Sequence, residues 1–360
     1  MSIIRRIIKK IIPSFILKEY RIIRFDESQI IYRGSAYKNF LQEAVAAARP
    51  NVYGKAKQTL LKDIKKVYLT DGTRPDEYLL YNYDSKDKKE RDQYMPQRLK
   101  DAILCSYYGD KTAIVIGEMR DKYFFYKLVK PYFKRDVTKV ESDDDRDAFN
   151  VFCNKHPRFI CKIINGGCGV GVRVEEVQNE KQINGLFKEL IQQGGWIIEE
   201  LIQQDPSISA FNSSSVNTVR FPSFKHGNKI VQKYPCIRFG RKGSIVDNAG
   251  QGGVFASIDI ETGTIITNGF DELGHEYECH PDSKIRFNGF AIPRWNELLE
   301  EAKQAHMSLS EKQVYVAFDF ALSAKGWVIV EANWGDFVLQ QTALKRGLKK
   351  EFIQMLKGYE

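Results

Sequence analysis

The sequence predicts an α+β protein in which a mainly helical N-terminal region precedes a longer part where strands and helices alternate. Three observations support this class. Residues 36–110 are polar and largely helical in pattern, Arg158–Lys162 reads as a strand that runs into a glycine-rich stretch, and Val314–Trp334 reads as a β-hairpin. At 360 residues the chain is long enough to hold two or three subdomains, each with its own hydrophobic core.

The first 24 residues are predicted to form a basic amphipathic helix. They hold seven basic side chains and one acid, so six of the nine net positive charges lie here. A position in the interface of an anionic membrane fits this pattern, because each basic residue near such a surface contributes roughly 1 kcal/mol. The alternative is a helix that docks on the protein's own core or in an oligomer contact. Nucleic acid is not expected as a partner, because the basic face carries no interleaved aromatic residues. The apolar positions follow helical spacing: Ile3, Ile4, Ile7, Ile8, Ile11, Ile12, Phe15 and Ile16.

Composition favours a cytoplasmic protein that lies peripherally on the inner face of the membrane. The chain is 43% hydrophobic and 28% charged, which is typical of globular proteins. Charges interrupt every turn of the N-terminal segment, which argues against a transmembrane span or a secretory signal. The six cysteines contain no CxxC pair and a chain of this length needs no disulfides, so we expect free thiols in a reducing cytosol.

Residues 25–112 are expected to form the helical N-terminal region. The segment AYKNFLQEAVAAAR has a helical pattern that must stop at Pro50, because proline disfavours helical conformation in the residue before it. The charge run Asp84–Gln97 is interpreted as a solvated helix or linker. A boundary is expected near Tyr108–Lys111, where charged residues give way to TAIVIGEM.

A lysine and a glycine-rich loop form the first candidate site. The predicted strand Arg158–Lys162 ends in Lys162, and the glycines that follow can bring backbone N–H groups close to phosphates while the ammonium neutralises them. The loop is neither a Walker A motif nor GxGxxG. A glycine-rich turn without a ligand is the alternative. The glycines are Gly166, Gly167, Gly169 and Gly171.

A strand with two adjacent acids is the second candidate. It follows a predicted helix at Lys181–Gln193, and Glu199 and Glu200 interrupt its apolar run. A strand that exits into a linker with free backbone groups is suited to binding adenine.

The predicted hairpin carries the third candidate, a cation site. Asp319 lies in its first strand, and Glu331 and Asn333 lie in its second, on either side of a turn at Lys325-Gly326. On paired antiparallel strands these side chains can point to one face. Two carboxylates and an amide oxygen suit Mg²⁺, which usually bridges to the phosphates of a nucleotide. Acids that are simply solvated at a sheet edge are the alternative.

Taken together and in order, these motifs resemble the ATP-grasp superfamily. Shorter motifs resemble more narrowly its polysaccharide-associated, "sugar-transfer" branch, and the resemblance spans roughly residues 115–345. The general motifs are Asp121-Lys122, Lys162 with its loop, IIEELI at 197–202, and Asp319 with Glu331-Ala-Asn333. The narrower ones are SVNTVRF (215–221), IRFG and DNAGQGG (237–253), IDIETG (258–263), HPDS and IPRW (280–295), and FDFALSAKGWVIVEAN.

The resemblance implies an ATP-grasp fold, in which two α+β lobes hold ATP between their sheets. The small lobe is expected at 113–200 and the large lobe, with the metal site, at 201–360. The implied roles are phosphate contacts by Lys122, Lys162, Gly166, Gly167 and Gly169, adenine contacts by Glu199, Glu200 and Ile202, a ribose contact by Asp205, and Mg²⁺ ligation by Asp319, Glu331 and Asn333.

The resemblance also implies a reaction: a carboxylate attacks the γ-phosphate of ATP, and an amine then displaces phosphate from the acylphosphate. Arg220, Arg238, Arg241 and Asn248 are the candidate catalytic residues. Arginine binds carboxylate and acylphosphate groups well, with surface ion pairs as the alternative, and Asn248 with Gly252-Gly253 could form a second anion-binding turn. His280 is interpreted as a substrate-side or structural residue. One position departs from D-alanine-ligase-like members, in which an arginine stands two residues before the metal aspartate, because Ala317 stands there.

The function this implies is an ATP- and Mg²⁺-dependent ligase. Its substrates would be an amine and a small-molecule or glycan carboxylate, such as a sugar acid in bacterial capsule or surface polysaccharide biosynthesis. A phosphotransferase acting on a sugar and a non-catalytic, nucleotide-binding partner of glycosyltransferases are the alternatives. Retention of the charged set argues against the second of these, because buried charges are costly when they serve no purpose.

Overall fold

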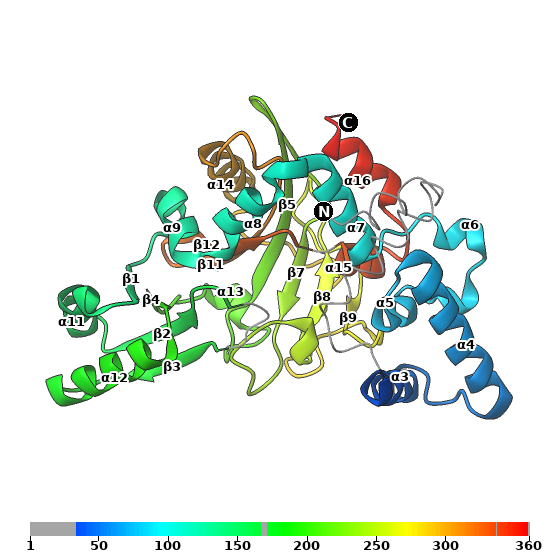
Figure 1. Cartoon of the computed structure of the whole chain (residues 1–360), viewed down its shortest axis with the longest axis horizontal. Coiled ribbons are helices and arrows are strands. Elements are labelled where there is room, and N and C mark those ends of the chain that lie inside the picture. Colours follow the sequence, from blue (N-terminus) through cyan, green and yellow to red (C-terminus); the bar gives the residue numbers. More distant parts are fainter. Residues whose placement is uncertain (1–33, 167–170, 336, 359–360) are drawn as a thin grey trace, which may run out of the picture. The chain divides into compact units, whose positions relative to one another are not determined.

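The computed structural model describes residues 34–166, 171–335 and 337–358 (Figure 1). The predicted basic helix at residues 1–24 lies outside them, and so do Gly167 and Gly169. The described chain divides into two compact units. The first holds residues 34–109, 272–276 and 337–352, and the second holds most of the remainder. The predicted domain boundaries at residues 24, 112 and 200 stay predictions.

The first unit is helical. The predicted helix before Pro50 is confirmed as α3, and α4 ends at Gly72, whose left-handed backbone (φ 73°) lets its N–H donate to the Tyr68 carbonyl. Tyrosines from α5 onward pack with aliphatic residues of α3 and α4, such as Val45 and Ile64, in one buried cluster. The helices are α3 (Gly34–Ala48), α4 (Gly54–Asp71), α5 (Pro75–Leu80), η3 (Tyr83–Ser85), α6 (Lys88–Arg91), α7 (Gln97–Tyr108) and α15 (Val338–Ala343), and α16 (Lys349–Leu356) begins in this unit.

A buried glutamate organises the start of α5 in this unit. Glu77 is fully buried, and its carboxylate accepts hydrogen bonds from the backbone N–H groups of Arg74 (2.9 Å) and Gln97 (2.6 Å). Burial raises the pKa of Glu77 to about 7, although Arg74 opposes this shift.

The smaller sheet of the second unit contains the strand of the glycine-rich loop. Its strands are β1 (Val137–Val140), β2 (Arg158–Ile163), β3 (Arg173–Glu176) and β4 (Trp196–Glu200), antiparallel in the order β1-β4-β2-β3. Helices α11 (Arg146–Lys155) and α12 (Glu180–Gln193) pack with one face of this sheet around a cluster that includes Phe149, Phe159 and Phe187. The predicted strand at 158–162, helix at 181–193 and strand with two acids are therefore confirmed.

The larger sheet carries the predicted hairpin. Neighbouring strands of this sheet follow the order β9-β8-β7-β5-β11-β12, and β6 also pairs with β5. The hairpin consists of β11 and β12 with a turn at Ala324-Lys325, and β11 is buried along its whole length. The strands are β5 (Thr218–His226), β6 (Lys229–Gln232), β7 (Cys236–Phe239), β8 (Val254–Ser257), β9 (Gly269–Phe270), β10 (Glu276–Tyr277), β11 (Tyr315–Ser323) and β12 (Gly326–Asn333).

Helices around the two sheets complete the second unit. Near its start, α8 (Thr112–Arg120), α9 (Lys122–Leu128) and α10 (Lys130–Phe133) follow one another, and α14 (Trp295–Ser308) packs on β5. The predicted α+β class is confirmed. No helix in the described part of the chain is long and apolar enough to cross a bilayer. Shorter helices are η4 (Gly109–Lys111), η5 (Asp143–Asp145), α13 (Pro206–Ser209) and η6 (Ala249–Gln251).

Candidate active site

Most of the predicted site residues line one pocket of about 140 Å³ in the second unit. Strands β2 and β4 of the smaller sheet and β5, β7 and β12 of the larger sheet contribute to its lining. The pocket therefore lies between residues of the two sheets, as an ATP-grasp fold requires. The predicted residues that line it are Lys122, Lys162, Gly166, Glu199, Glu200, Ile202, Arg238, Asn248 and Glu331. A cavity of about 100 Å³ shares Lys122, Gly166, Glu199 and Glu331 with it and adds Asn333.

Lys122 is placed by the N-terminus of α9. Asp121 caps this helix by accepting a hydrogen bond from the Phe124 N–H (2.8 Å), so Lys122 is the first helical residue. The Lys122 ammonium donates to the carbonyl of Gly166, at the start of the glycine-rich loop. Burial lowers the pKa of Lys122. The ammonium therefore lies at Gly166, the first glycine of the predicted phosphate loop.

Lys162 belongs to a buried network on the pocket face of the smaller sheet. Side chains alternate along a strand, and the register of β2 with β4 puts Lys162 and Glu199 on one face. The Lys162 ammonium lies 2.9 Å from a Glu199 carboxylate oxygen, and Arg135 also donates to this carboxylate. Burial alone would raise the pKa of Glu199, but Arg135 and Lys162 lower it to about 2. Glu199 therefore stays charged and holds both cations.

Arg135 is a site residue that sequence reasoning missed. It is buried, and it also donates to the Ile329 carbonyl of β12 (2.6 Å). Its bonds therefore connect Glu199 on the smaller sheet with a strand of the larger one. The arginine stands in a charged stretch between α10 and β1, which gives no signal that it is buried.

Asp319 is the centre of a charged row on the larger sheet. The strand register places Asp319 directly opposite Arg220 of β5 on one side and Glu331 of β12 on the other. Asp319 is fully buried and accepts hydrogen bonds from Arg220 (3.0 and 2.9 Å) and from Arg238 of β7 (3.0 Å). Burial opposes ionisation, but Arg220 and Arg238 lower the pKa of Asp319 below its usual value.

A β-bulge brings the two predicted metal carboxylates together. From the turn to Phe320, β11 and β12 pair in a regular register, with Phe320 opposite Ile329. Continued without a change, this register would pair Asp319 with Val330 and would put Glu331 on the opposite face. The register shifts after Phe320, so that Asp319 faces Glu331 and Ala317 faces Asn333. All three predicted ligands therefore share one face of the hairpin.

The donor set at this place fits Mg²⁺. Burial raises the pKa of Glu331, and the negative charge of Asp319 raises it further. Two carboxylates that oppose each other's ionisation would be relieved by a cation between them, and two carboxylates with an amide oxygen are ligands that Mg²⁺ prefers. We infer that the residues present suit this ion.

Asp247 is a second residue that was not predicted. It lines the pocket and is buried, and its carboxylate accepts hydrogen bonds from the backbone N–H (2.9 Å) and hydroxyl (2.5 Å) of Thr218. Arg238 lies 3.4 Å from it, so the guanidinium stands between Asp247 and Asp319. Burial raises the pKa of Asp247, with Arg238 opposing the shift. Asp247 is the first residue of the DNAGQGG motif, and this motif was the signal from which its role in the site could have been predicted.

Four predicted residues direct their side chains elsewhere. Arg241 forms a bidentate ion pair with Asp282 (2.8 and 3.1 Å). His280 is fully buried, and its ring lies 3.0 Å from the Gly240 carbonyl and between aromatic side chains, so its environment is that of a structural residue. The carboxylate of Asp205 caps α13. Glu200 lines the pocket, but its side chain lies on the other face of β4 from Glu199 and accepts a hydrogen bond from the backbone of Asp136.

Two α+β lobes with lysines, an arginine and carboxylates around one pocket agree with the ATP-grasp class of proteins. The sequence matches the family described as sugar-transfer associated ATP-grasp over residues 119–357, and the chain belongs to this family. The predicted resemblance and the predicted ATP-grasp fold are thus confirmed. A comparison with curated protein sequences found no match.

Several solved structures are similar to this chain at low sequence identity. Phosphoribosylamine–glycine ligase from Thermotoga maritima is 13% identical, with 69% of this chain and 56% of that chain covered and a TM-score of 0.45. D-alanyl-alanine synthetase A from Vibrio cholerae is 11% identical, with 67% and 65% covered and a TM-score of 0.39. The ligase PsnB, complexed with a variant of its minimal precursor, Mg and ADP, is 12% identical, with 72% and 66% covered and a TM-score of 0.40. The chain spans less than two thirds of the length of each.

Proposed function

We propose that the protein is an ATP- and Mg²⁺-dependent ligase that activates a carboxylate as an acylphosphate and joins it to an amine. The observation that carries this proposal is the set of opposite charges at one pocket, which Lys122 of α9, Lys162 of the smaller sheet and Glu331 of the larger sheet line, with Asp319 buried beside Glu331. Buried charges are costly and concentrate at functional sites. Membership of the ATP-grasp family supports the assignment of this pocket to a nucleotide.

The chain's own residues have defined tasks in this proposal. ATP would supply the phosphoryl group, and Mg²⁺ would neutralise the charge that develops on it. Lys122 and Lys162 bind phosphate oxygens through charge-assisted hydrogen bonds. Glu199 and Arg135 keep Lys162 in position, since their mutual contacts are buried. Leu201 and Ile202 line the pocket where the chain leaves β4, and we assign their backbone groups to adenine.

Ala317 stands where D-alanine-ligase-like members have an arginine, and arginines of two other strands can take over its task. Arg220 of β5 lies opposite Asp319, and Arg238 of β7 contacts the same carboxylate. Two guanidinium groups beside the metal carboxylates can stabilise the negative charge of an acylphosphate and of the oxyanion formed when the amine attacks. We assign this task to Arg220 and Arg238. Arg241 is the weaker candidate because Asp282 already binds it.

We propose a sugar acid or glycan precursor of surface polysaccharide biosynthesis as the carboxylate substrate. The support for this class is the family description, which associates its members with sugar transfer. The proposed place of action is the cytoplasmic face of the membrane, with residues 1–24 as the peripheral anchor.

Product analysis tests the reaction. The protein is incubated with ATP, Mg²⁺ and mixtures of sugar acids and amines, and products are identified by mass spectrometry, with Glu331→Gln as the inactive control. ADP, free phosphate and an amide in equal amounts support the ligase. ADP with a phosphorylated sugar and no free phosphate would identify a phosphotransferase instead, and ATP binding without any turnover would identify a binding partner.

A further inference from the structure

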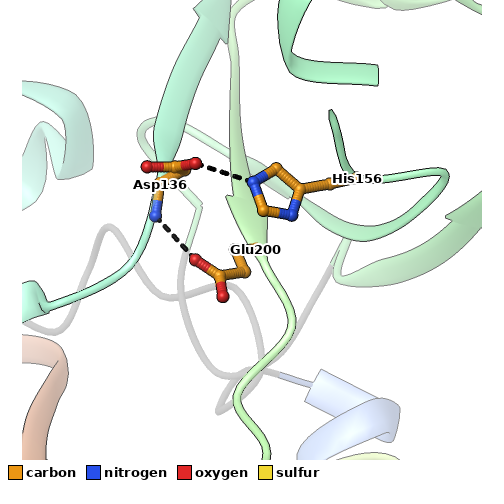
Figure 2. Close-up of side chains that lie close together, drawn as sticks. All are labelled: Asp136, His156 and Glu200. Atoms are coloured by element: carbon orange, nitrogen blue, oxygen red, sulfur yellow. Dashed lines mark hydrogen bonds and ion pairs between the residues drawn. The ribbon is translucent and has the colours of Figure 1, made fainter. Parts of the chain in front are cut away.

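Three potential metal ligands converge where β4 leaves the smaller sheet, on the face opposite the ATP pocket. Figure 2 shows the His156 ring directed at the Asp136 carboxylate and the Glu200 carboxylate directed at the Asp136 backbone N–H; the potential ligand atoms of the three residues all lie within 4.8 Å of one another. Asp136 precedes β1, His156 follows α11, and Glu200 ends β4. None of the tasks assigned to the ATP pocket uses the side chains of this cluster.

The fold brings these residues together before any ligand arrives. In the β1–β4 pair, Val137 lies opposite Glu199, which makes Asp136 and Glu200 neighbours on the next rung. The Asp136 N–H donates to a Glu200 carboxylate oxygen (3.0 Å), and His156 Nε2 lies 2.7 Å from an Asp136 carboxylate oxygen (Figure 2). The His156 ring packs on Phe152 of α11 at 4.9 Å and is only 15% exposed, so its orientation is restricted.

Two lysines pair with the carboxylates, and an incoming metal ion can displace both of them. Lys155 pairs with Asp136, and Lys325 lies 2.8 Å from Glu200. Their side chains are 66% and 55% exposed, and such solvent-exposed pairs contribute little to stability. Both lysines line an open groove of about 960 Å³ that Asp136 also lines, so the ammonium groups have room to leave and an ion has a path to enter.

We propose that Asp136, His156 and Glu200 bind a divalent transition-metal ion of the Zn²⁺ type, at a site separate from the Mg²⁺ site. One imidazole nitrogen and two carboxylate oxygens are ligands that Zn²⁺ accepts, with water in the fourth position. Imidazole favours Zn²⁺ and related ions over Mg²⁺ and Ca²⁺, which prefer oxygen ligands alone.

The distances are compatible with such an ion. Ligands about 2.1 Å from a tetrahedral Zn²⁺ lie about 3.4 Å apart. The present spread of up to 4.8 Å closes with small rotations of the two carboxylates, while the restricted His156 ring stays in place. The two carboxylates would neutralise the ion, and Lys155 and Lys325 would turn into the groove. The bound ion would then connect β1, α11 and β4 of the smaller sheet.

Binding of Co²⁺ tests this site, because this ion replaces Zn²⁺ and absorbs visible light when a low-coordinate site with nitrogen ligands holds it. Full-length protein freed of metal by a chelator is titrated with Co²⁺ in excess Mg²⁺, which occupies oxygen-only sites. We expect one equivalent of Co²⁺ to give visible absorption that Zn²⁺ then removes. His156→Gln and Asp136→Asn should weaken binding at least tenfold, in line with the loss of a ligand.

Two matched controls distinguish this site from adventitious binding. Lys155→Ala should bind Co²⁺ as tightly as the unaltered protein or more tightly, because it removes a competing cation. His226→Gln should leave binding unchanged, since His226 lies elsewhere, bonded to the Met355 carbonyl. No uptake by the unaltered protein, or uptake that neither His156→Gln nor Asp136→Asn reduces, would overturn the proposal. If His156→Gln lowers the melting temperature of the metal-free protein, Co²⁺ binding by the isosteric Asp136→Asn variant decides whether the site exists.

Discussion

Asp319→Asn and Glu331→Gln should both abolish ATP turnover, yet they should change stability in different ways. Asp319 is fully buried and accepts three hydrogen bonds from Arg220 and Arg238. An amide in its place removes the carboxylate that Arg220 and Arg238 share, although Arg238 keeps its contact with Asp247. Breaking a buried ion pair by removing one partner costs about 3–5 kcal/mol. For a unit of this size, each kcal/mol lowers the melting temperature by about 2–4 °C, so Asp319→Asn should lower it by roughly 6–20 °C.

Glu331→Gln should be neutral or stabilising by comparison. Burial and the charge of Asp319 both raise the pKa of Glu331, so its ionised form is disfavoured where it stands. An amide of the same shape removes a like charge next to Asp319 and leaves both arginines paired. Turnover should still disappear, because the variant lacks one of the two carboxylates for Mg²⁺.

Thermal melts without Mg²⁺, together with ATP turnover, measure both effects. Asp282→Asn is the matched control, because Asp282 also accepts a bidentate pair from an arginine, Arg241, but is partly exposed. Its loss should cost about 1 kcal/mol or less. The reasoning fails if Asp319→Asn melts like Asp282→Asn, or if Glu331→Gln is as destabilising as Asp319→Asn.

Three further outcomes are expected. Lys162→Ala should weaken the binding of ATP far more than that of adenosine in calorimetric titrations, because we assign its ammonium to the phosphates; equal losses for both ligands would reject that role. Glu77 has a pKa of about 7 in the folded state against an ordinary value of 4.5, so the folded state binds its proton more tightly than the unfolded state does. The free energy of unfolding should therefore fall by about 3 kcal/mol as pH rises from 4.5 to 7. Glu77→Gln should flatten this dependence in denaturant titrations at several pH values, and an unchanged slope would contradict it. Deletion of residues 1–24 should release the protein from acidic vesicles without loss of ATP turnover; unchanged vesicle binding with a lower melting temperature would favour a docked helix.

The secondary structure around the site was predictable because its signals are local. Short runs of apolar and β-branched residues predict β2, β4 and the β11–β12 hairpin, and the spacing in 181–193 predicts α12. The alternation of side chains along a strand separates Glu199 from Glu200, since adjacent residues of a strand face opposite sides. One of these acids therefore belongs to the pocket, and the other belongs to the Asp136 cluster.

The contacts between distant residues could not be predicted in this way. Asp319 and Glu331 were expected on one face of the hairpin, and they share it only because a bulge shifts the register of β12; alternation counted from the turn alone would place them on opposite faces. Arg135 and Asp247 became site residues through partners 64 and 29 positions away, Glu199 and Thr218. Burial of these charged groups depends on how the sheets pack, which no local pattern encodes.

The fate of a carboxylate oxygen of the substrate tests most directly whether the reaction passes through an acylphosphate. If the chain makes an acylphosphate, one oxygen of the substrate carboxylate remains on phosphorus when the amine displaces phosphate. With ¹⁸O in the carboxylate of an accepted sugar acid, the account predicts one ¹⁸O atom in each released phosphate, measured by mass spectrometry. Amide formation with unlabelled phosphate would contradict it, because the carboxylate would then never have been phosphorylated.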